Sequence, residues 1–238
     1  MVHDDRLIVA LDYSDMEEAK ALVLELGERV TYYKVGMELY YTAGNEAIRF
    51  LKEQGKQVFL DLKLHDIPNT VARSMAVLTA LGADMLNLHA GGGTKMMAEA
   101  AEAVRSAAMQ LGKEPPKLIA VTVLTSTGAE EWQELGCKNT IEKQVVALAL
   151  LAKEAGLDGV VASPREAGAI RNACGEDFLI VTPGVRPSGA ELNDQNRVAS
   201  PAGAFAGGSS HIVVGRPITK AEDKLEAVDA ILAEIRGV

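Results

Sequence analysis

The sequence predicts an α/β fold, a single (β/α)8 barrel of the TIM type. Short runs rich in apolar and β-branched residues alternate with longer helical segments, and the alternation repeats eight times. The length of 238 residues suits one such barrel, and no linker or low-complexity tract divides the chain. We therefore expect residues 1–238 to form one domain. The alternative is an open doubly wound sheet, but its glycine fingerprint G-x-G-x-x-G is missing after the first strand.

Eight strands are expected, each followed by a helical segment. The expected strands are residues 7–11, 32–35, 58–63, 85–88, 118–123, 159–162, 178–181 and 211–214. The first helix should begin with a capping box, in which Ser14 is the N-cap and Glu17 lies three residues on. Pro164 should open the sixth helix at the favoured first-turn position. Residues 183–197 are too polar and too rich in Gly and Pro to form a regular element.

Composition limits the partners of the chain. A net charge of −9 and a pI of about 5.0 argue against a nucleic-acid or anionic membrane surface, because both favour basic patches. No run of about 18 apolar residues and no cationic apolar leader are present. Cys137 and Cys174 form no C-x-x-C motif, which is typical of a reducing compartment. We therefore expect a cytoplasmic protein that acts on a small molecule.

Polar residues follow most of the expected strands, where a (β/α)8 barrel has its active site. A single polar residue at a strand end is ordinary, because strand ends contact water. Several charged residues that converge at the same end of the barrel are better explained by an active site. The residues at these ends are Asp12, Lys34, Asp61, Lys63, His89, Thr125, Ser126, Ser163, Thr182, Gly215 and Arg216.

The third expected strand carries the densest charge. Asp61, Lys63, His65 and Asp66 fall within six positions, just before Pro68. Side chains alternate along a strand, so Asp61 and Lys63 should share one face. Charges on a buried strand are costly unless they pair or take part in chemistry.

Two other chemistries deserve comparison. Asp61, His65 and Asp66 resemble a metal-ligand set, but the ammonium groups of Lys34 and Lys63 can neutralise the carboxylates without a cation. A Schiff base at Lys63 requires a lowered pKa, whereas flanking aspartates raise the pKa of a lysine. We therefore expect Lys63 to act as a charged acid, in an array whose charges need no metal ion.

A second signal follows the last strand. Gly215 and Arg216 stand where barrels commonly bind phosphate through backbone N–H groups, and a guanidinium can add bidentate contacts. The segment from Pro183 to Arg186, together with Gln195, can form a lid over the same anion. The alternative is a solvated loop.

Residues 61–70, DLKLHDIPNT, resemble the signature decapeptide of the orotidine 5′-phosphate decarboxylase family. Further similar blocks follow in the order of that family, at residues 8–12, 34–38, 87–90, 121–126, 181–186 and 213–219. The pattern is similar to the bacterial, single-function form. The resemblance implies conversion of orotidine 5′-phosphate to UMP and carbon dioxide, the last step of UMP synthesis, without metal or cofactor.

The resemblance also implies a role for each matching residue. Lys34, Asp61, Lys63 and Asp66 form a charged array in which Lys63 donates the proton, and Asp66 and Thr70 reach the neighbouring site of a homodimer. It implies that Asp12 and Lys34 bind the ribose hydroxyls and that Thr125 and Ser126 bind the pyrimidine. The phosphate contacts that it implies are Arg186, Gln195, Gly215 and Arg216. Ile67 and Pro183 are implied to make further contacts with the substrate.

Two rival functions remain open at this point. Magnesium-dependent sugar-phosphate decarboxylases and hexulose-phosphate synthases share Asp-x-Lys-x-x-Asp but have an acidic residue where this chain has Lys34. A non-catalytic nucleotide-binding barrel would be indicated by a broken charged array, and the array here is intact.

Overall fold

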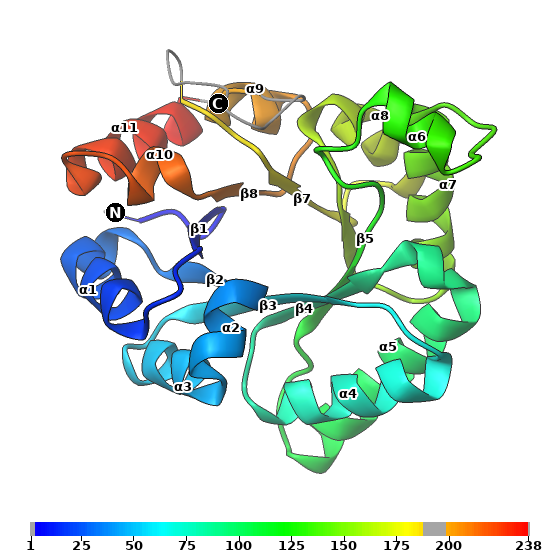
Figure 1. Cartoon of the computed structure of the whole chain (residues 1–238), viewed down its shortest axis with the longest axis horizontal. Coiled ribbons are helices and arrows are strands. Elements are labelled where there is room, and N and C mark those ends of the chain that lie inside the picture. The colour runs from blue at the N-terminus through cyan, green and yellow to red at the C-terminus, as the bar shows by residue number, and fades with distance from the viewer. Residues whose placement is uncertain (1–2, 188–198, 238) are drawn as a thin grey trace.

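The structure is a computed structural model that describes residues 3–187 and 199–237. Eight parallel strands form a closed barrel in sequence order, and β1 pairs with β8 to complete the ring (Figure 1). The predicted (β/α)8 fold is confirmed. The strands are β1 (Leu7–Leu11), β2 (Tyr32–Gly36), β3 (Gln57–Leu64), β4 (Met85–His89), β5 (Lys117–Val121), β6 (Gly159–Val161), β7 (Leu179–Pro183) and β8 (His211–Val214).

Helices surround the ring of strands on its outside (Figure 1). They are α1 (Met16–Leu26), α2 (Met37–Ala43), α3 (Asn45–Glu53), α4 (Pro68–Ala80), α5 (Gly93–Gln110), α6 (Ala129–Glu134), α7 (Ile141–Glu154), α8 (Pro164–Cys174), α9 (Pro201–Ala206), α10 (Arg216–Thr219) and α11 (Lys224–Arg236). Within the described ranges, no helix combines the length and apolarity needed to cross a membrane.

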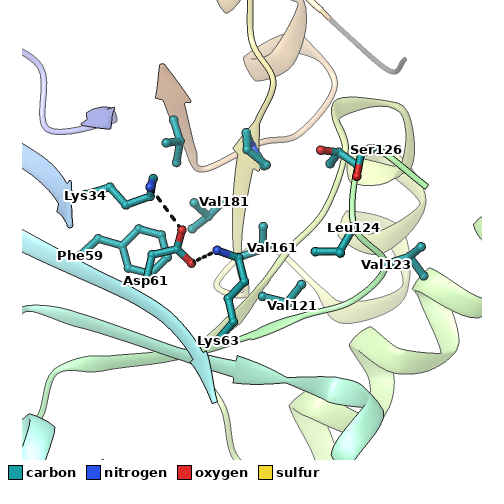
Figure 2. A pocket seen from close by; sticks show the side chains of 13 residues that line it. Lys34, Phe59, Asp61, Lys63, Val121, Val123, Leu124, Ser126, Val161 and Val181 are labelled. Carbon is teal, nitrogen blue, oxygen red and sulfur yellow. Dashed lines mark ion pairs between the residues drawn. The ribbon is translucent and has the colours of Figure 1, made fainter. Parts of the chain in front are cut away.

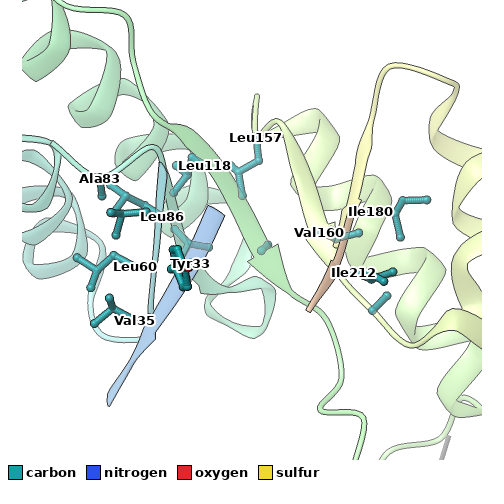
Figure 3. Close-up of a cluster of buried hydrophobic side chains, with 14 of the residues drawn as sticks. Tyr33, Val35, Leu60, Ala83, Leu86, Leu118, Leu157, Val160, Ile180 and Ile212 are labelled. Atoms are coloured by element: carbon teal, nitrogen blue, oxygen red, sulfur yellow. The ribbon is translucent and has the colours of Figure 1, made fainter. Parts of the chain in front are cut away.

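Strand alternation divides the apolar residues into two layers. Ile8 and Ala10 on β1 belong to a cluster inside the barrel, whereas Leu7, Val9 and Leu11 pack outward against the helices. Figure 3 shows part of the outer layer, in which side chains of several strands lie between the sheet and the helices. The inner cluster fills part of the barrel interior, and a cavity lies above it towards the carboxyl ends of the strands.

The amino-terminal end of the barrel, called the floor below, is held by side chains that bind strand backbone. The Asp84 carboxylate accepts a hydrogen bond of 2.7 Å from the Val58 N–H group and pairs with Lys52 at 2.7 Å. The Asp158 carboxylate accepts one of 2.8 Å from Leu118 N–H. Asp84 stands just before β4 and binds the start of β3, and Asp158 stands just before β6 and binds the start of β5. Each contact therefore fixes the relative height of two neighbouring strands.

Three local expectations need correction or extension. The N-cap of α1 is Asp15 and not Ser14, because the Asp15 carboxylate accepts the Glu17 N–H at 2.7 Å and the helix starts one residue later than expected. Strand β5 ends at Val121, two residues early. The short helices α2, α9 and α10 were not anticipated, whereas Pro164 opens α8 as expected.

Candidate active site

The mouth of the barrel, at the carboxyl ends of the strands, holds an aspartate between two lysines. Lys63 Nζ lies 2.8 Å from Asp61 Oδ1, and Lys34 Nζ lies 3.4 Å from Asp61 Oδ2 (Figure 2). Lys34 Nζ also donates to Asp12 Oδ1 at 2.9 Å. The side chains of Asp61 and Lys34 are only 10% and 11% exposed. The strand ends therefore converge as the sequence predicts, and these four residues form a continuous alternating array.

The neighbouring charges decide the ionisation of this array. Burial alone raises the pKa of Asp61, but the charges of Lys34 and Lys63, with hydrogen bonds from Lys63 and Asn87, bring it below its usual range. Burial alone lowers the pKa of Lys34, but Asp61 and Asp12 raise it above its usual value. Asp61 and Lys34 are therefore both charged at neutral pH.

The backbone at Lys63 departs from a regular strand. Its φ angle is +53°, in the left-handed region that residues with a Cβ seldom adopt. The register of β3 against β4 shifts between Leu60 and Leu64, so the ladder is interrupted at this place. The conformation costs on the order of 1–3 kcal/mol, and strain of this kind gathers at functional sites. Simple alternation predicted the shared face of Asp61 and Lys63, but it did not predict this bulge.

Asn87, on β4, was missed as a site residue by the sequence reasoning. Its side chain is 2% exposed and contacts both partners of the array on β3. Asn87 Oδ1 accepts the backbone N–H of Lys63 at 2.8 Å, and Asn87 Nδ2 donates to Asp61 Oδ1 at 2.6 Å. The available signal was an amide within the otherwise apolar run Met85 to Leu88, because a buried amide needs hydrogen-bond partners.

A cavity of about 250 Å³ opens beside the array. Figure 2 shows Lys34, Asp61 and Lys63 on one side of this cavity and Ser126 across from them, with Val161 and Val181 between. The cavity is thus charged on one wall, polar on the opposite wall and apolar at its base. Its lining comprises Lys34, Phe59, Asp61, Lys63, Val121, Val123, Leu124, Thr125, Ser126, Val161, Val181, Pro183 and Val213.

Two glycines lie against the array. A Cβ built on Gly36, at the end of β2, would lie 2.9 Å from Lys34 Nζ, so the absence of a side chain there leaves room for the ammonium group. A Cβ on Gly215, directly after β8, would make an ordinary contact of 3.5 Å with Asp12 Oδ2. The backbone of Gly215 therefore lies beside the Asp12 end of the array, as expected for a residue that follows the strand next to β1.

Three expected site residues lie outside the cavity. Asp66, Ile67 and Thr70 are exposed at the start of α4, and none of them lines the cavity. The Asp66 carboxylate accepts the backbone N–H of Ile67 at 2.6 Å, and Ile67 is 66% exposed. Within this one chain, Asp66 therefore does not join the array of Lys34, Asp61 and Lys63.

The expected phosphate contacts are also separate from the cavity lining. Arg186 is buried, and its Nη1 donates to the Val185 carbonyl at 3.0 Å. Arg216 is exposed and begins α10, directly after Gly215. Gln195 lies outside the described residues.

The metal-ligand set considered from the sequence does not assemble. Within residues 3–187 and 199–237, no three His, Cys, Asp or Glu side chains gather as a potential ion site. His65 instead packs against His89, with ring centroids 5.5 Å apart. Burial, together with the charges of His65 and Lys63, lowers the pKa of His89.

A closed parallel barrel, with a buried ion-pair array and a cavity at the carboxyl ends of its strands, defines an enzyme of the (β/α)8 class. The model of the orotidine 5′-phosphate decarboxylase / HUMPS family matches residues 5–231, and the chain belongs to that family. The resemblance found in residues 61–70 is thereby confirmed.

Individual relatives match nearly the whole chain. A protein of Moorella thermoacetica described as orotidine 5′-phosphate decarboxylase is 53% identical over 235 residues, which cover 98% of this chain and 93% of that protein. A Pelobacter propionicus protein of the same description is 51% identical and covers 97% of this chain and 95% of its own length. The crystal structure of orotidine 5′-phosphate decarboxylase from Lactobacillus acidophilus has a TM-score of 0.86 at 42% identity, over 98% of this chain and 99% of that chain.

Proposed function

We propose that this enzyme decarboxylates orotidine 5′-phosphate to UMP and carbon dioxide, the last step of de novo pyrimidine synthesis. The observation that carries the proposal is Asp61, buried between the ammonium groups of Lys34 and Lys63 on one wall of the mouth cavity. The family and the descriptions of the relatives support the same reaction.

The reaction needs a fixed positive charge near C6 of the pyrimidine. When the bond between C6 and the carboxylate breaks, its electron pair remains on C6 in the plane of the ring. It cannot delocalise into the π system, so electrostatic stabilisation must come from the protein. We assign this role to Lys63, whose ammonium then transfers a proton to C6. One well-placed donor contributes roughly 3–4 kcal/mol, by analogy with oxyanion holes.

The other array residues have distinct proposed roles. Asp61 holds Lys63 in place and faces the departing carboxylate, whose loss removes a like-charge contact. Lys34 keeps Asp61 ionised inside the protein, which is supported by the raised pKa of Lys34 and the lowered pKa of Asp61. No step in this scheme requires a metal ion or an organic cofactor.

We propose substrate contacts both within the cavity and beside it. We assign the pyrimidine to Thr125 and Ser126, opposite the array, and the ribose hydroxyls to Asp12 and Lys34. Pro183, the last residue of β7, also lines the cavity and is assigned a further substrate contact. The proposed phosphate contacts are Arg186, Gln195, Gly215 and Arg216. Because phosphate is remote from C6, its binding energy can drive closure around the reacting ring.

Asp66 and Thr70 are assigned to the neighbouring subunit's site in a homodimer, with Asp66 completing the partner's charged array, and Ile67 is assigned a further substrate contact. The exposure of Asp66 and Thr70 beside the start of α4 supports the first assignment. The net charge of −9 supports a small-molecule substrate rather than a nucleic acid, and we assign the enzyme to the cytoplasm.

The test follows the ultraviolet absorbance of orotidine 5′-phosphate when purified protein is added in the presence of EDTA. Loss of the 6-carboxylate changes the chromophore, so turnover gives a progressive absorbance change, and UMP is then identified by chromatography. We expect full turnover with EDTA. Absence of UMP would refute the proposal, and activity that requires added Mg²⁺ would favour the sugar-phosphate chemistry of related barrels.

A further inference from the structure

We propose that Asn87 is a positioning residue for this reaction: its side-chain amide fixes the Lys63 backbone and the Asp61 carboxylate in their reactive arrangement. The proposal rests on the function assigned above. Asn87 is 2% exposed and does not line the cavity, so its effect on a substrate must pass through Lys63 and Asp61.

The orientation of the amide is set by its two partners. The Lys63 N–H group can only donate, and it lies 2.8 Å from one end of the amide, which must therefore be the carbonyl oxygen. The Asp61 carboxylate can only accept, and it lies 2.6 Å from the other end, which must be the amino group. A flipped amide would put like groups together at both contacts. Only one orientation of Asn87 satisfies both neighbours.

The first contact repairs a break in the sheet. The ladder between β3 and β4 loses register between Leu60 and Leu64, where Lys63 adopts its left-handed conformation. A bulge leaves backbone N–H groups without the carbonyl that a regular ladder supplies. The Asn87 carbonyl oxygen takes the place of that backbone acceptor for Lys63. The amide thus holds Lys63 in the conformation from which its ammonium reaches Asp61 and the cavity.

The second contact fixes the rotation of the Asp61 carboxylate. Asp61 Oδ1 receives both Lys63 Nζ, at 2.8 Å, and the Asn87 amino group, while Oδ2 faces Lys34 Nζ at 3.4 Å. Without the amide, Oδ1 would have a single mobile lysine as its partner. Asn87 therefore keeps one oxygen towards Lys63 and the other towards Lys34, which spaces the two ammonium groups around the reacting ring.

The first test replaces Asn87 by leucine, which has a similar volume and neither hydrogen-bonding group. We expect kcat per folded molecule to fall on the order of 10²-fold, because small misplacements of reacting groups have effects of this size. Since the cavity lining is unchanged, the affinity for UMP should stay close to that of the unchanged enzyme. A fall in thermal stability alone, with kcat unchanged, would overturn the proposal.

Thr79→Val is the matched control. Thr79 is also buried, and its hydroxyl donates to the Met75 carbonyl at 2.8 Å, but it lies near the end of α4 and away from the mouth. Its replacement removes one buried side-chain hydrogen bond without touching the array. We expect lower thermal stability with unchanged kcat, and an equal loss of kcat in both variants would show that Asn87→Leu acts only through general destabilisation.

Asn87→Asp keeps the shape and the acceptor for Lys63, so it tests the proposal even if the leucine variant fails to fold. The new carboxyl group meets Asp61 at the distance of a hydrogen bond, and two carboxylates so close must share a proton. When that proton is lost at higher pH, repulsion should displace Asp61. We therefore expect a new alkaline limb in the profile of kcat against pH, at lower pH than any such limb of the unchanged enzyme.

The outcomes separate this inference from the proposed function. If the unchanged enzyme fails to convert orotidine 5′-phosphate, the proposed function is wrong. If it turns over and Asn87→Asp has the same kcat and the same pH profile, the positioning role of Asn87 is wrong.

Discussion

The mouth and the floor of the barrel both pair aspartates with lysines, but they surround the carboxylate differently. At the floor, Asp84 binds the Val58 N–H group, and its lysine partner, Lys52, has a side chain that is 37% exposed. At the mouth, Asp61 is 10% exposed and receives side-chain donors from Lys34, Lys63 and Asn87. The floor carboxylate thus satisfies backbone next to solvent, whereas the mouth carboxylate is buried to hold charges in place.

This difference separates a structural ion pair from a functional one. An exposed pair costs little to form and contributes about 0–1 kcal/mol, so most of the value of Asp84 comes from its bond to the backbone. A buried pair must overcome desolvation and often contributes no net stability. The mouth also contains the left-handed residue Lys63, which adds strain. We infer that the contacts at the floor raise the free energy of unfolding of the barrel, whereas the arrangement at the mouth lowers it and provides the charges that the reaction needs.

The largest expected effect is that of Lys63→Ala at the mouth. It removes the proposed proton donor, so kcat should fall by at least about 10³-fold, while UMP still binds. Steady-state kinetics and calorimetric titration with UMP measure the two quantities. Lys52→Ala at the floor is the control and should leave kcat unchanged. Full activity in Lys63→Ala would remove Lys63 from the mechanism.

Arg216→Ala should have the next largest effect. Loss of a charge-assisted hydrogen bond to phosphate, worth about 1.5–3 kcal/mol, should lower kcat/KM roughly 10- to 100-fold, mainly through weaker binding. Inorganic phosphate added as a competitor should inhibit this variant less than the unchanged enzyme. An unchanged kcat/KM would exclude Arg216 from the phosphate site.

Asp84→Ala tests the floor. The fully buried Val58 would lose the acceptor for its N–H group, which should lower the free energy of unfolding by about 1–3 kcal/mol. Because Asp84 is at the opposite end from the cavity, kcat at a temperature where the variant is folded should not change. Urea denaturation and kinetics measure both, and a loss of kcat in the folded variant would contradict the division between mouth and floor.

The smallest effect concerns the strain at Lys63. Glycine adopts positive φ without the steric cost of a Cβ, so Lys63→Gly should be more stable than Lys63→Ala by about 1 kcal/mol. Both variants lack the ammonium group, so the comparison isolates the backbone. Equal stability in urea denaturation would show that the left-handed conformation carries no strain.

The sequence predicts those features that depend on strand periodicity. The eight strands, and the convergence of Asp12, Lys34, Asp61 and Lys63, follow because every parallel strand ends at the same side of the barrel. The bulge at Lys63 does not follow from periodicity, because it depends on how β3 pairs with β4. The hydrogen bonds of Asn87 also depend on this pairing, because both of its partners lie on β3, so no local sequence pattern predicts them.

For other residues, the local sequence does not decide between two structures. Ser14 and Asp15 are both good N-cap residues, so the choice between them depends on where the chain leaves β1. The expected roles of Asp66 and Thr70 concern a second copy of the chain, and both residues are exposed in this one.

The charged array comes entirely from the first half of the chain. Asp12, Lys34, Asp61 and Lys63 lie in or just after β1, β2 and β3, and Asn87 supports them from β4. The second half, β5 to β8 with the segments that follow them, supplies the opposite cavity wall and the proposed phosphate contacts (Figure 1). A nucleotide bound as proposed therefore bridges two half-barrels that meet at the β4–β5 and β8–β1 seams. Such a ligand binds only when both halves are folded and paired. Its binding should therefore raise the free energy needed to separate the two halves, so the nucleotide stabilises the barrel that binds it.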